Sequence, residues 1–416
     1  MRVDDRVHFC PPGRLIIGAG SRAQLPALVA RLGYRQGVLV TDTFFSGHTP
    51  WVEEYVSAAR ALGIETLVFD GGAPDPTTTL CDQATAAIRA ALDGHVPDHV
   101  IALGGGSNID LAKVLCITLP TGRPTHDFVK GLSPSDRPIP FVALPTTAGT
   151  GSEATPGAIL VDPENATKVA VMDNSLRPQV ALIDPEFTYC CPPKVTADAG
   201  IDAFTHAIES YLTLDSSKFD RAGSADPGYS GRSSLTMIFA REAISLCARY
   251  LKRAYDDGAD IEARTGMCYA SLYAALSYGS AGLNAVHGIA YAVAGATHRS
   301  HGTTNAVMLP YVLAELAGTR AEELLDVARI FGIDSSDPGH AIGELCGQIR
   351  SLIGAVGIPT TLKKIGIEKA SLPSLLEDAL GVTRLARAFP VPDVKAAYAR
   401  ILHNAFEGEL GKSLAV

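Results

Sequence analysis

The sequence predicts two domains. The first, residues 1–188, is an α/β domain with a mostly parallel sheet, and the second, residues 189–416, is entirely helical. Three observations support this prediction. A chain of 416 residues is too long for one ordinary core. Short apolar runs alternate with helical patterns in the first half, and we find no convincing strand after Pro192.

The first half alternates strands and helices. Short runs rich in β-branched and aliphatic residues indicate buried strands, and amphipathic patterns of helical period separate several of them. This rhythm predicts a Rossmann-like, mostly parallel sheet with helices on both faces. The expected strands lie at 38–40, 66–69, 100–103, 141–144, 158–161, 168–171 and 180–183, and the expected helices at 23–32, 52–62 and 81–92.

The domain boundary is expected near residues 184–194, where Asp184-Pro185 and Pro192-Pro193 interrupt any regular element. Residues 214–232 are polar and rich in Gly, Ser and Asp, which predicts a long loop. Loops of this length are usually lids or contact surfaces, or are disordered. The clearest helices of the second half are expected at 233–255, 262–278 and 394–405.

Composition restricts the classes of partner. The net charge of −9 and the lack of a basic stripe argue against nucleic-acid binding. Eight cysteines without a CxxC pair fit free thiols in a reducing compartment. The N-terminus lacks the apolar region of a secretory signal, and no apolar run is long enough to span a membrane. We therefore expect a cytoplasmic protein with neither a nucleic-acid nor a membrane partner.

A glycine-rich segment predicts a cofactor site. Residues 103–110 follow an expected strand and open an expected helix. Their three glycines let the backbone approach an anion, and the free N–H groups of the helix N-terminus suit a pyrophosphate. The spacing is not the GxGxxG of the standard dinucleotide fold. A tight strand-to-helix turn without a ligand is the alternative interpretation.

Two further features point to the same cofactor. Residues 145–153 follow another expected strand and gather hydroxyl groups and glycines, which suit phosphate, ribose and carboxamide groups. Asp42, at the end of the strand at 38–40, is placed to accept a hydrogen bond from a ribose 2′-OH. A carboxylate there would repel a 2′-phosphate, so NAD is favoured over NADP. The alternative is that Asp42 only caps a turn.

One carboxylate and three histidines form a candidate metal site. Asp202 and His206 are four residues apart on an expected helix and so share one face. His287 and His301, fourteen residues apart, add two imidazoles. Such a set suits a borderline divalent ion such as Fe²⁺ or Zn²⁺. Taken singly, each histidine is more often structural than a ligand.

These motifs, in this order, resemble those of the iron-containing (group III) alcohol dehydrogenases, which have the dehydroquinate-synthase-like fold. The resemblance extends over nearly the whole chain, and its motifs are specific. They are Gly104-Gly105-Gly106-Ser107-x-x-Asp110-x-Ala112-Lys113, Pro145-Thr146-Thr147-Ala148-Gly149-Thr150-Gly151-Ser152-Glu153, Gly200-Ile201-Asp202-Ala203-x-x-His206-Ala207-Ile208-Glu209, and His287-Gly288 followed by His301-Gly302.

The resemblance implies a metal, usually ferrous iron, held by Asp202, His206, His287 and His301, with the spacing favouring His301 over His298. It also implies a nicotinamide cofactor and a homodimer or larger homo-oligomer. Asp75 stands where some relatives have a cofactor-contacting Asn. The residues expected at the dinucleotide site are Asp42, Asp75, Gly105, Gly106, Ser107, Asp110, Thr146, Thr147, Thr150, Thr155 and Lys168.

Tyr291 departs from the commonest family pattern, which has a proton-relaying His four residues after the ligand that corresponds to His287. A phenol titrates near pH ~10 and an imidazole near neutrality, so Tyr291 is a poor base at neutral pH. Tyr also occupies this position in the hydroxyacid-oxoacid transhydrogenase branch, which residues 251–264 resemble too. Tyr291 either relays the proton or packs against the nicotinamide.

The resemblance implies reversible hydride transfer between a nicotinamide and a small primary alcohol or aldehyde, with the metal as a Lewis acid on the substrate oxygen. A transhydrogenase with a retained cofactor is the main alternative. A dehydroquinate-synthase-type lyase and a non-catalytic binding protein are more distant ones. An anionic substrate group, if there is one, is expected to pair with Arg177 or with a residue of the loop at 214–232.

Overall fold

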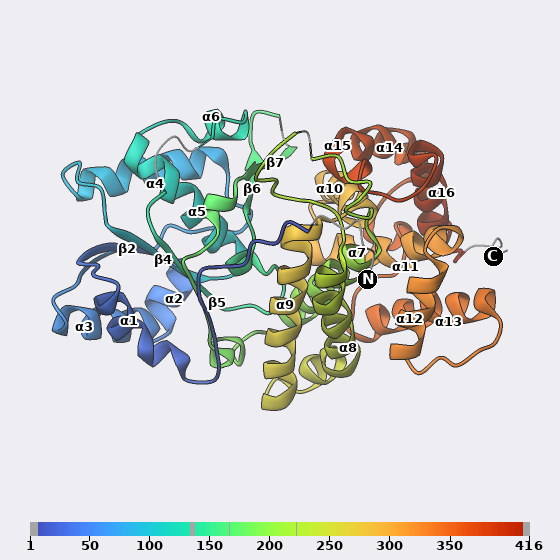
Figure 1. Ribbon diagram of the computed structural model, residues 1–416, viewed down its shortest axis with the longest axis horizontal. Helices are drawn as coiled ribbons and strands as arrows, with labels where there is room; N and C mark the ends of the chain where they lie inside the picture. Colours follow the sequence, from blue (N-terminus) through green and yellow to red (C-terminus); the bar gives the residue numbers. More distant parts are fainter. Residues whose placement is uncertain (1–6, 134–137, 166, 222, 411–416) are drawn as a thin grey trace. The chain divides into compact units, whose positions relative to one another are not determined.

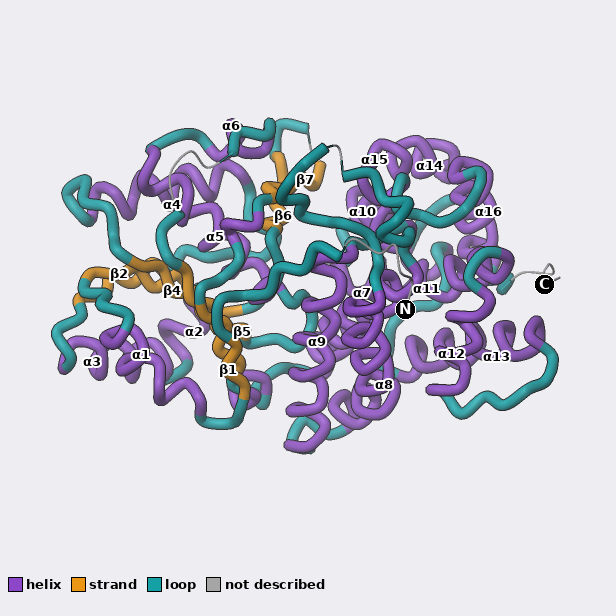
Figure 2. Tube along the Cα trace, in the orientation of Figure 1, coloured by secondary structure: helices purple, strands orange, loops and turns teal. Residues whose placement is uncertain are grey.

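The computed structural model describes residues 7–133, 138–165, 167–221 and 223–410. The chain divides into two compact units. The α/β unit consists of residues 10–147 and 151–189, and the helical unit consists of residues 7–9, 148–150 and 190–410. All of the described strands lie in the α/β unit (Figures 1 and 2).

The main sheet of the α/β unit has six parallel strands in the order β1-β8-β5-β4-β2-β3. The mostly parallel sheet predicted from the sequence is therefore confirmed. Because all six strands run the same way, their carboxyl ends share one edge of the sheet. The strands are β1 Leu15–Ile17, β2 Gln36–Val40, β3 Glu65–Phe69, β4 His99–Gly104, β5 Phe141–Pro145 and β8 Val180–Ile183.

Both faces of this sheet are covered by helices. Alternate strand residues point to opposite sides, so Val38 and Val40 pack with α4 and α5, whereas Leu39 packs with α1 and α3. Each face forms an apolar core of its own, which fits the near-continuous apolar strands of a doubly covered sheet. The helices are α1 Leu25–Arg31, α2 Thr43–His48, α3 Trp51–Ala61, α4 Thr78–Ala91, α5 Gly106–Thr121 and α6 Thr125–Val129.

Two strands form a separate hairpin. β6 (Gly157–Asp162) and β7 (Thr167–Met172) pair antiparallel with each other and do not join the main sheet. The residues of β6 alternate between buried and half-buried, as expected for a ribbon with one covered face, whereas those of β4 are buried throughout. The hairpin carries Lys168, one of the residues expected at the cofactor site.

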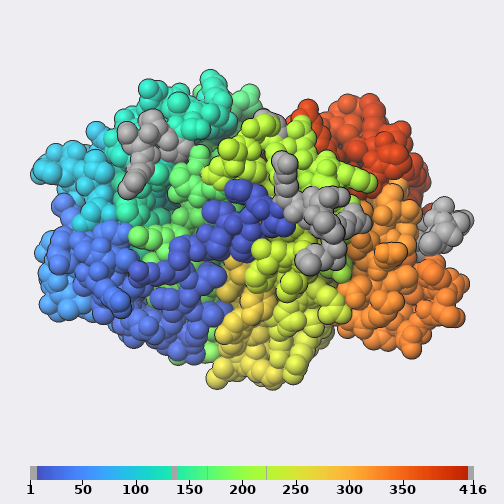
Figure 3. All heavy atoms as spheres, in the orientation of Figure 1, coloured from blue at the N-terminus to red at the C-terminus, as the bar shows by residue number. Residues whose placement is uncertain are grey.

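The helical unit is built around α7, which packs against α8, α9 and α11. Helix α12 packs against α13, and α14 packs against α16. In the space-filling view, the first pair falls in the orange region and the second pair in the red region (Figure 3). None of the helices in the described part of the chain is long and apolar enough to cross a membrane. The helices are α7 Pro193–Leu212, α8 Ser234–Asp256, α9 Ile261–Ala281, α10 Ala285–Thr297, α11 His301–Glu315, α12 Ala321–Ile330, α13 Pro338–Ala355, α14 Leu372–Gly381, α15 Thr383–Ala386 and α16 Val394–Glu407.

The polar stretch at 214–232 forms a loop with no helix among its described residues. Its two ends are joined by a buried ion pair, in which Arg232 Nε lies 2.8 Å from Asp215 Oδ1. Arg232 also pairs with Glu323 of α12 at 2.6 Å. The C-terminal end of the loop, at Arg232, is therefore fixed to α12, and Tyr229 lies three residues before it.

Candidate active site

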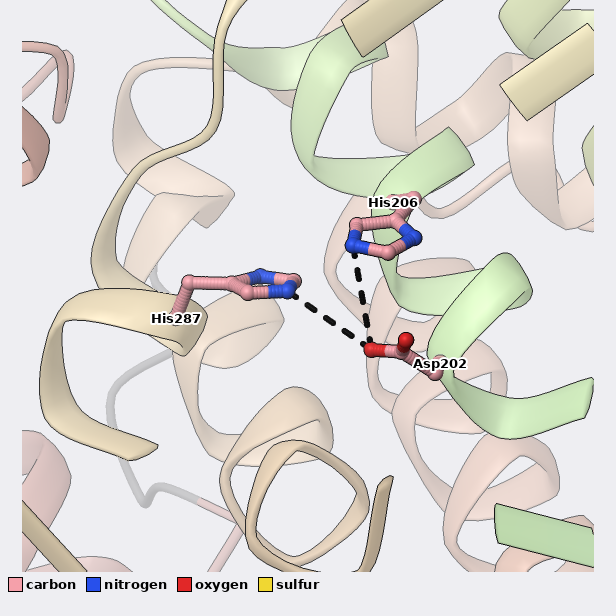
Figure 4. A group of neighbouring side chains, drawn as sticks. All are labelled: Asp202, His206 and His287. Atoms are coloured by element: carbon pink, nitrogen blue, oxygen red, sulfur yellow. Dashed lines mark ion pairs between the residues drawn. The ribbon is translucent and has the colours of Figure 1, made fainter. Parts of the chain in front are cut away.

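Helix α7 supplies the first two candidate metal ligands. Asp202 and His206 are one turn apart on this helix, and both side chains are buried. The Nε2 atom of His206 lies 3.8 Å from Oδ1 of Asp202. As Figure 4 shows, the imidazole is directed toward the carboxylate. The four-residue spacing thus places both donor atoms on one buried face of the helix.

Two further helices complete the set. His287 lies on α10, and His301 is the first residue of α11. The Nε2 atoms of both residues lie 3.7 Å from the same Asp202 oxygen. The structure thus brings together all four residues that the sequence analysis singled out. His298, by contrast, is exposed at the C-terminal end of α10 with a φ of 54°.

Glu209 and Asn305 belong to this cluster, although neither was singled out from the sequence. One Glu209 oxygen pairs with Nδ1 of His287, and the other accepts the backbone N–H of Val286 at 2.7 Å. The Asn305 amide nitrogen lies 2.8 Å from Asp202 Oδ1 and 3.1 Å from Nε2 of both His287 and His301. These contacts fix the orientation of the candidate ligands.

The charges of the cluster shift its pKa values. Burial lowers the pKa of His206 to about 4, although Asp202 opposes this shift. Burial alone would also lower the pKa of His287, but Glu209 and Asp202 outweigh it and raise that pKa to about 9. Burial would raise the pKa of Asp202, yet the facing imidazoles hold it below its usual range. Asp202 is therefore an anion at neutral pH.

The donor atoms fit a divalent transition metal. Three imidazole nitrogens face one anionic carboxylate oxygen at 3.7–3.8 Å, and Asp202, His206 and His287 are buried. Fe²⁺ and Zn²⁺ accept such mixed nitrogen and oxygen sets. The bond between Glu209 and His287 is the carboxylate–histidine pairing that orients a metal-binding imidazole. An ordinary hydrophobic core would not place one carboxylate among three histidines.

Two tyrosines line this cluster. The Tyr278 ring stacks on His206 with centroids 4.1 Å apart. The Tyr291 ring stacks on His301 at 5.4 Å and meets His287 edge-on at 6.2 Å. Burial raises the pKa of Tyr291, although Arg384 opposes the shift. Tyr291 therefore stays a neutral phenol beside the candidate ligands.

The first cofactor motif lies at the carboxyl ends of β2 and β4, which are neighbours in the sheet. Asp42 caps α2 by accepting the N–H groups of Phe44 and Phe45, and its second oxygen accepts the Asn108 amide at 2.8 Å. Gly104 has a φ of 151°, and a Cβ there would lie 2.1 Å from the Asn108 amide nitrogen. Asp42 therefore caps a helix and is also tied to the glycine-rich turn.

Asp75, Ser107 and Lys168 come together from three separate segments. The Asp75 backbone N–H donates to Ser107 Oγ at 3.2 Å, and Lys168 Nζ lies 2.9 Å from Asp75 Oδ1. Asp75 has a positive φ of 49°, which is uncommon for a residue other than glycine. Ser107 is in the first turn of α5, whose N-terminal N–H groups begin at Gly105 and Gly106. This group suits a phosphate or ribose.

The second cofactor motif packs beside the first. The Thr146 backbone N–H donates to the Gly104 carbonyl at 3.0 Å, and a Cβ on Gly105 would lie 3.6 Å from the Thr147 side chain. Asp110 is buried, accepts the Ile159 N–H at 2.9 Å and also bonds Ser152. The Asp110 carboxylate thus contacts protein groups and holds this loop in place.

Lys113 holds this loop in place, although in the sequence it stood out only as the last residue of the first motif. Its fully buried ammonium donates to Thr155 Oγ1, Ser152 Oγ and the Thr155 and Gly157 carbonyls at 2.7–3.2 Å. Burial lowers the pKa of Lys113 to about 8, although Asp110 opposes this shift. Lys113 is therefore still mostly protonated at neutral pH.

Thr150 differs from the other residues expected at the cofactor site, because the short segment 148–150 belongs to the helical unit. The Thr150 carbonyl accepts a hydrogen bond from Tyr278. A Cβ on Gly149 would lie 2.7 Å from Cβ of Ala199, so only glycine fits against α7 there. Residues 148–150 thus pack against the helices that carry the candidate metal ligands.

Two family models match this chain. Residues 12–185 match the model described as iron-containing alcohol dehydrogenase, and residues 229–406 match the C-terminal model of the same family. The chain belongs to the iron-containing alcohol dehydrogenase family. The matches cover most of the chain and confirm the family predicted from the ordered motifs.

Members of this family match the chain along most of its length. Long-chain-alcohol dehydrogenase 1 of Geobacillus thermodenitrificans is 33% identical over 410 residues, which are 97% of this chain and 98% of the relative. Lactaldehyde reductase of Escherichia coli (strain K12) is 31% identical, with 87% and 90% covered. A crystal structure of 1,3-propanediol oxidoreductase superposes with a TM-score of 0.86 at 28% identity, covering 96% of this chain and all of the other. The chain is thus an enzyme of the alcohol dehydrogenase class.

Glu209→Gln is expected to weaken metal binding while preserving the fold. The amide retains one oxygen for the backbone N–H groups but loses the charge that pairs with His287. Loss of such a partner typically weakens metal affinity by about 10- to 100-fold. Competition of the protein with a chelator measures this, with the exposed Glu344→Gln as a control. Unchanged affinity in Glu209→Gln would show that Glu209 does not orient a ligand.

Gly302→Ala is expected to destabilise the start of α11, next to His301. A Cβ at Gly302 would lie 2.1 Å from the Asp198 carbonyl oxygen of α7, so the backbone must shift. We expect the free energy of unfolding to fall by about 1–3 kcal/mol, the usual cost of overpacking. The matched control is Gly295→Ala, which points into open space and should not destabilise. Equal denaturation midpoints for both variants would contradict this packing.

Proposed function

We propose that the protein is a metal-dependent, NAD(H)-linked oxidoreductase that interconverts a small primary alcohol and its aldehyde. An alcohol and NAD⁺ yield an aldehyde, NADH and a proton, and the hydride passes between the carbinol carbon and the nicotinamide C4. The observation that carries the proposal is the convergence of Asp202, His206, His287 and His301 on one buried point. Several relatives are named as dehydrogenases or reductases of small alcohols and aldehydes.

In this proposal, each group of the cluster has a separate task. A bound divalent metal supplies Lewis acidity that stabilises negative charge on a substrate oxygen. Asp202 and the three imidazoles hold it, and Glu209 keeps the proton on Nδ1 of His287 so that Nε2 faces Asp202. The neutral Tyr291 phenol offers a hydrogen-bond donor beside His301 and is not the base at neutral pH.

The cofactor is proposed to be NAD rather than NADP. Asp42 stands at the end of β2, where a carboxylate accepts hydrogen bonds from a ribose 2′-OH and repels a 2′-phosphate. The amides at the start of α5 and the group formed by Asp75, Ser107 and Lys168 are the proposed contacts of the pyrophosphate and ribose. Curated relatives include NAD-dependent and NADPH-dependent enzymes, so relatedness alone does not decide between the two cofactors.

The test is NADH oxidation by anaerobically purified, Fe²⁺-loaded protein over a series of straight-chain aldehydes. We expect turnover that chelation abolishes and Fe²⁺ restores, with NADH used in preference to NADPH. Full turnover by the metal-free protein would refute the metal's part in the proposal. A preference for NADPH would refute the assignment of Asp42.

A second candidate is a transhydrogenase that passes hydride from a hydroxy acid to an oxo acid on a retained cofactor. Tyr291 favours it, because this branch of the family carries a tyrosine at that position and the phenol lies against His301. Such an enzyme would turn over without added NAD. Turnover of a hydroxy acid and oxo acid pair by dialysed protein would support the transhydrogenase, whereas strict dependence on added NAD would refute it.

A further inference from the structure

Arg384 places a positive charge next to the candidate metal centre. It lies on α15, which packs against α10, the helix of His287 and Tyr291. The phenol groups of Tyr229 and Tyr291 are polar neighbours of its guanidinium. Its Cζ atom lies 5.9 Å from the ring centroid of Tyr229. Because Tyr291 also stacks on His301, one phenol connects the guanidinium to a candidate metal ligand.

Among the described residues, no Asp or Glu oxygen lies within ion-pair distance of Arg384. The fully buried arginines among the described residues are instead satisfied by the protein. Arg232 pairs with Asp215 and Glu323, for example, and Arg264 donates to Thr196 and two backbone carbonyls. A guanidinium stays protonated in proteins, so Arg384 is a half-buried cation beside two neutral phenols.

Tyr229, one of the neighbours of Arg384, is held in position by packing. Tyr229 packs against Gly282, whose φ of 92° and lack of a side chain leave room for the ring, since a Cβ there would lie 3.1 Å from it. Tyr229 stands three residues before Arg232, which holds the base of the loop at 214–232. Arg384, Tyr229 and Tyr291 thus present one charged and two neutral donors from three segments of the helical unit.

We propose that Arg384, with Tyr229 and Tyr291, binds an anionic group on the substrate, so that the enzyme prefers aldehydes and alcohols that carry a carboxylate, sulfonate or phosphonate. This inference rests on the proposed function and adds the substrate class to it. Guanidinium groups bind such oxyanions through paired, charge-assisted hydrogen bonds. A neutral substrate would leave the Arg384 charge without a counter-charge, and the enzyme would discriminate against it.

Arg177 was the other arginine expected to pair with an anionic substrate group. In the structure its Nε donates to Asn174 Oδ1 at 3.0 Å and its Nη1 donates to the Ala154 carbonyl at 2.6 Å. Arg177 thus holds the polypeptide near the cofactor loops. The other expectation, a residue of the loop at 214–232, agrees with the position of Tyr229.

The test compares aldehydes of equal carbon number with and without the anion. Succinate semialdehyde is paired with butanal, and sulfoacetaldehyde and phosphonoacetaldehyde are each paired with acetaldehyde. We expect the Fe²⁺-loaded wild-type enzyme to prefer at least one anionic member in kcat/KM, and the preferred member identifies the anion. Arg384→Gln should reduce this preference by roughly 10- to 100-fold, mainly through KM, because a hydrogen bond to a charged group is lost. Arg384→Lys keeps the charge but cannot make the paired hydrogen bonds of a guanidinium. Its preference in kcat/KM should therefore lie between those of the wild-type enzyme and Arg384→Gln.

The control is Arg387→Gln, an exposed arginine three residues further along that should leave both members of every pair unchanged. Binding of unreactive succinate, sulfoacetate and phosphonoacetate, followed by calorimetry, gives a second readout that is independent of turnover. The unreactive acid that carries the preferred anionic group should bind more weakly to Arg384→Gln than to the wild-type enzyme. The proposal is overturned if the wild-type enzyme prefers the neutral aldehyde of every pair, or if Arg384→Gln lowers both members equally. If no aldehyde oxidises NADH, the proposed function itself has failed.

Discussion

Replacing His206 with alanine is expected to abolish stoichiometric binding of a divalent metal and to reduce turnover by at least about 100-fold, the usual loss when one electrostatic stabiliser of a transition state is removed. His206 offers its Nε2 3.8 Å from Asp202 Oδ1, within the cluster formed by His287 and His301. Its removal takes away one of the four candidate donors. Metal analysis and NADH oxidation on the same anaerobic preparation measure both effects.

The matched control is His298→Asn, because His298 is exposed only three residues before His301 and asparagine tolerates its positive φ. This control should keep its metal and its turnover. Far-ultraviolet circular dichroism of His206→Ala distinguishes loss of the site from loss of the fold. Metal content and turnover equal to those of the wild-type enzyme in a folded His206→Ala protein would exclude His206 as a ligand.

Lys113→Met is expected to lower the free energy of unfolding of the α/β unit by about 3–5 kcal/mol, the usual cost of removing one partner of a buried ion pair. Methionine fills much of the space but donates no hydrogen bond. The Thr155 and Gly157 carbonyls would lose their donor, and the buried Asp110 carboxylate would lose the cation 4.0 Å away. Chemical denaturation followed by fluorescence measures the change.

Two further variants test this explanation. Lys130→Met removes an exposed lysine of the same unit and should change stability by less than about 0.5 kcal/mol, as surface substitutions usually do. Lys113→Met combined with Asp110→Asn should be more stable than Lys113→Met alone, because residue 110 would no longer carry a buried charge without its cation. If Lys113→Met is no less stable than Lys130→Met, Lys113 does not hold the loop together.

Most strands of the main sheet could be predicted from the sequence. Short aliphatic runs such as 38–40 and 100–103 are typical of strands that are buried on both faces of a parallel sheet. β1 (Leu15–Ile17) was not predicted. It is only three residues long, and its partner β8 lies more than 160 residues further along the chain, so no local signal marks the pairing. Likewise, the short α2 begins where Asp42 caps it, directly after β2, and its apolar content is too brief to show a period.

The β6–β7 hairpin could have been recognised more fully. Both strands were expected at 158–161 and 168–171, but as members of an undivided group. Only residues 163–166 join them, whereas a parallel pair needs a crossover of a dozen or more residues. Connection length alone therefore predicts an antiparallel hairpin there. It does not reveal that the hairpin stands apart from the main sheet.

The candidate metal ligands could be selected from sequence because their spacing on helices is regular and the motifs are specific. Glu209 had a usable signal, since it follows Asp202 and His206 at seven and three residues and so shares their helix face. Arg384 had none. Its importance comes from contact with Tyr229 and Tyr291, which lie 155 and 93 residues earlier in the sequence. Only the folded helical unit brings these three together.

X-ray absorption spectroscopy of the anaerobically purified, Fe²⁺-loaded protein tests the metal centre most directly, because it counts imidazoles bound to the metal. The geometry of the cluster predicts scattering from three imidazoles and one carboxylate oxygen, with Asp202, His206, His287 and His301 as the ligands. The His301→Ala protein should show one imidazole fewer. A metal surrounded only by oxygen atoms, or an imidazole count that His301→Ala leaves unchanged, would contradict the assignment.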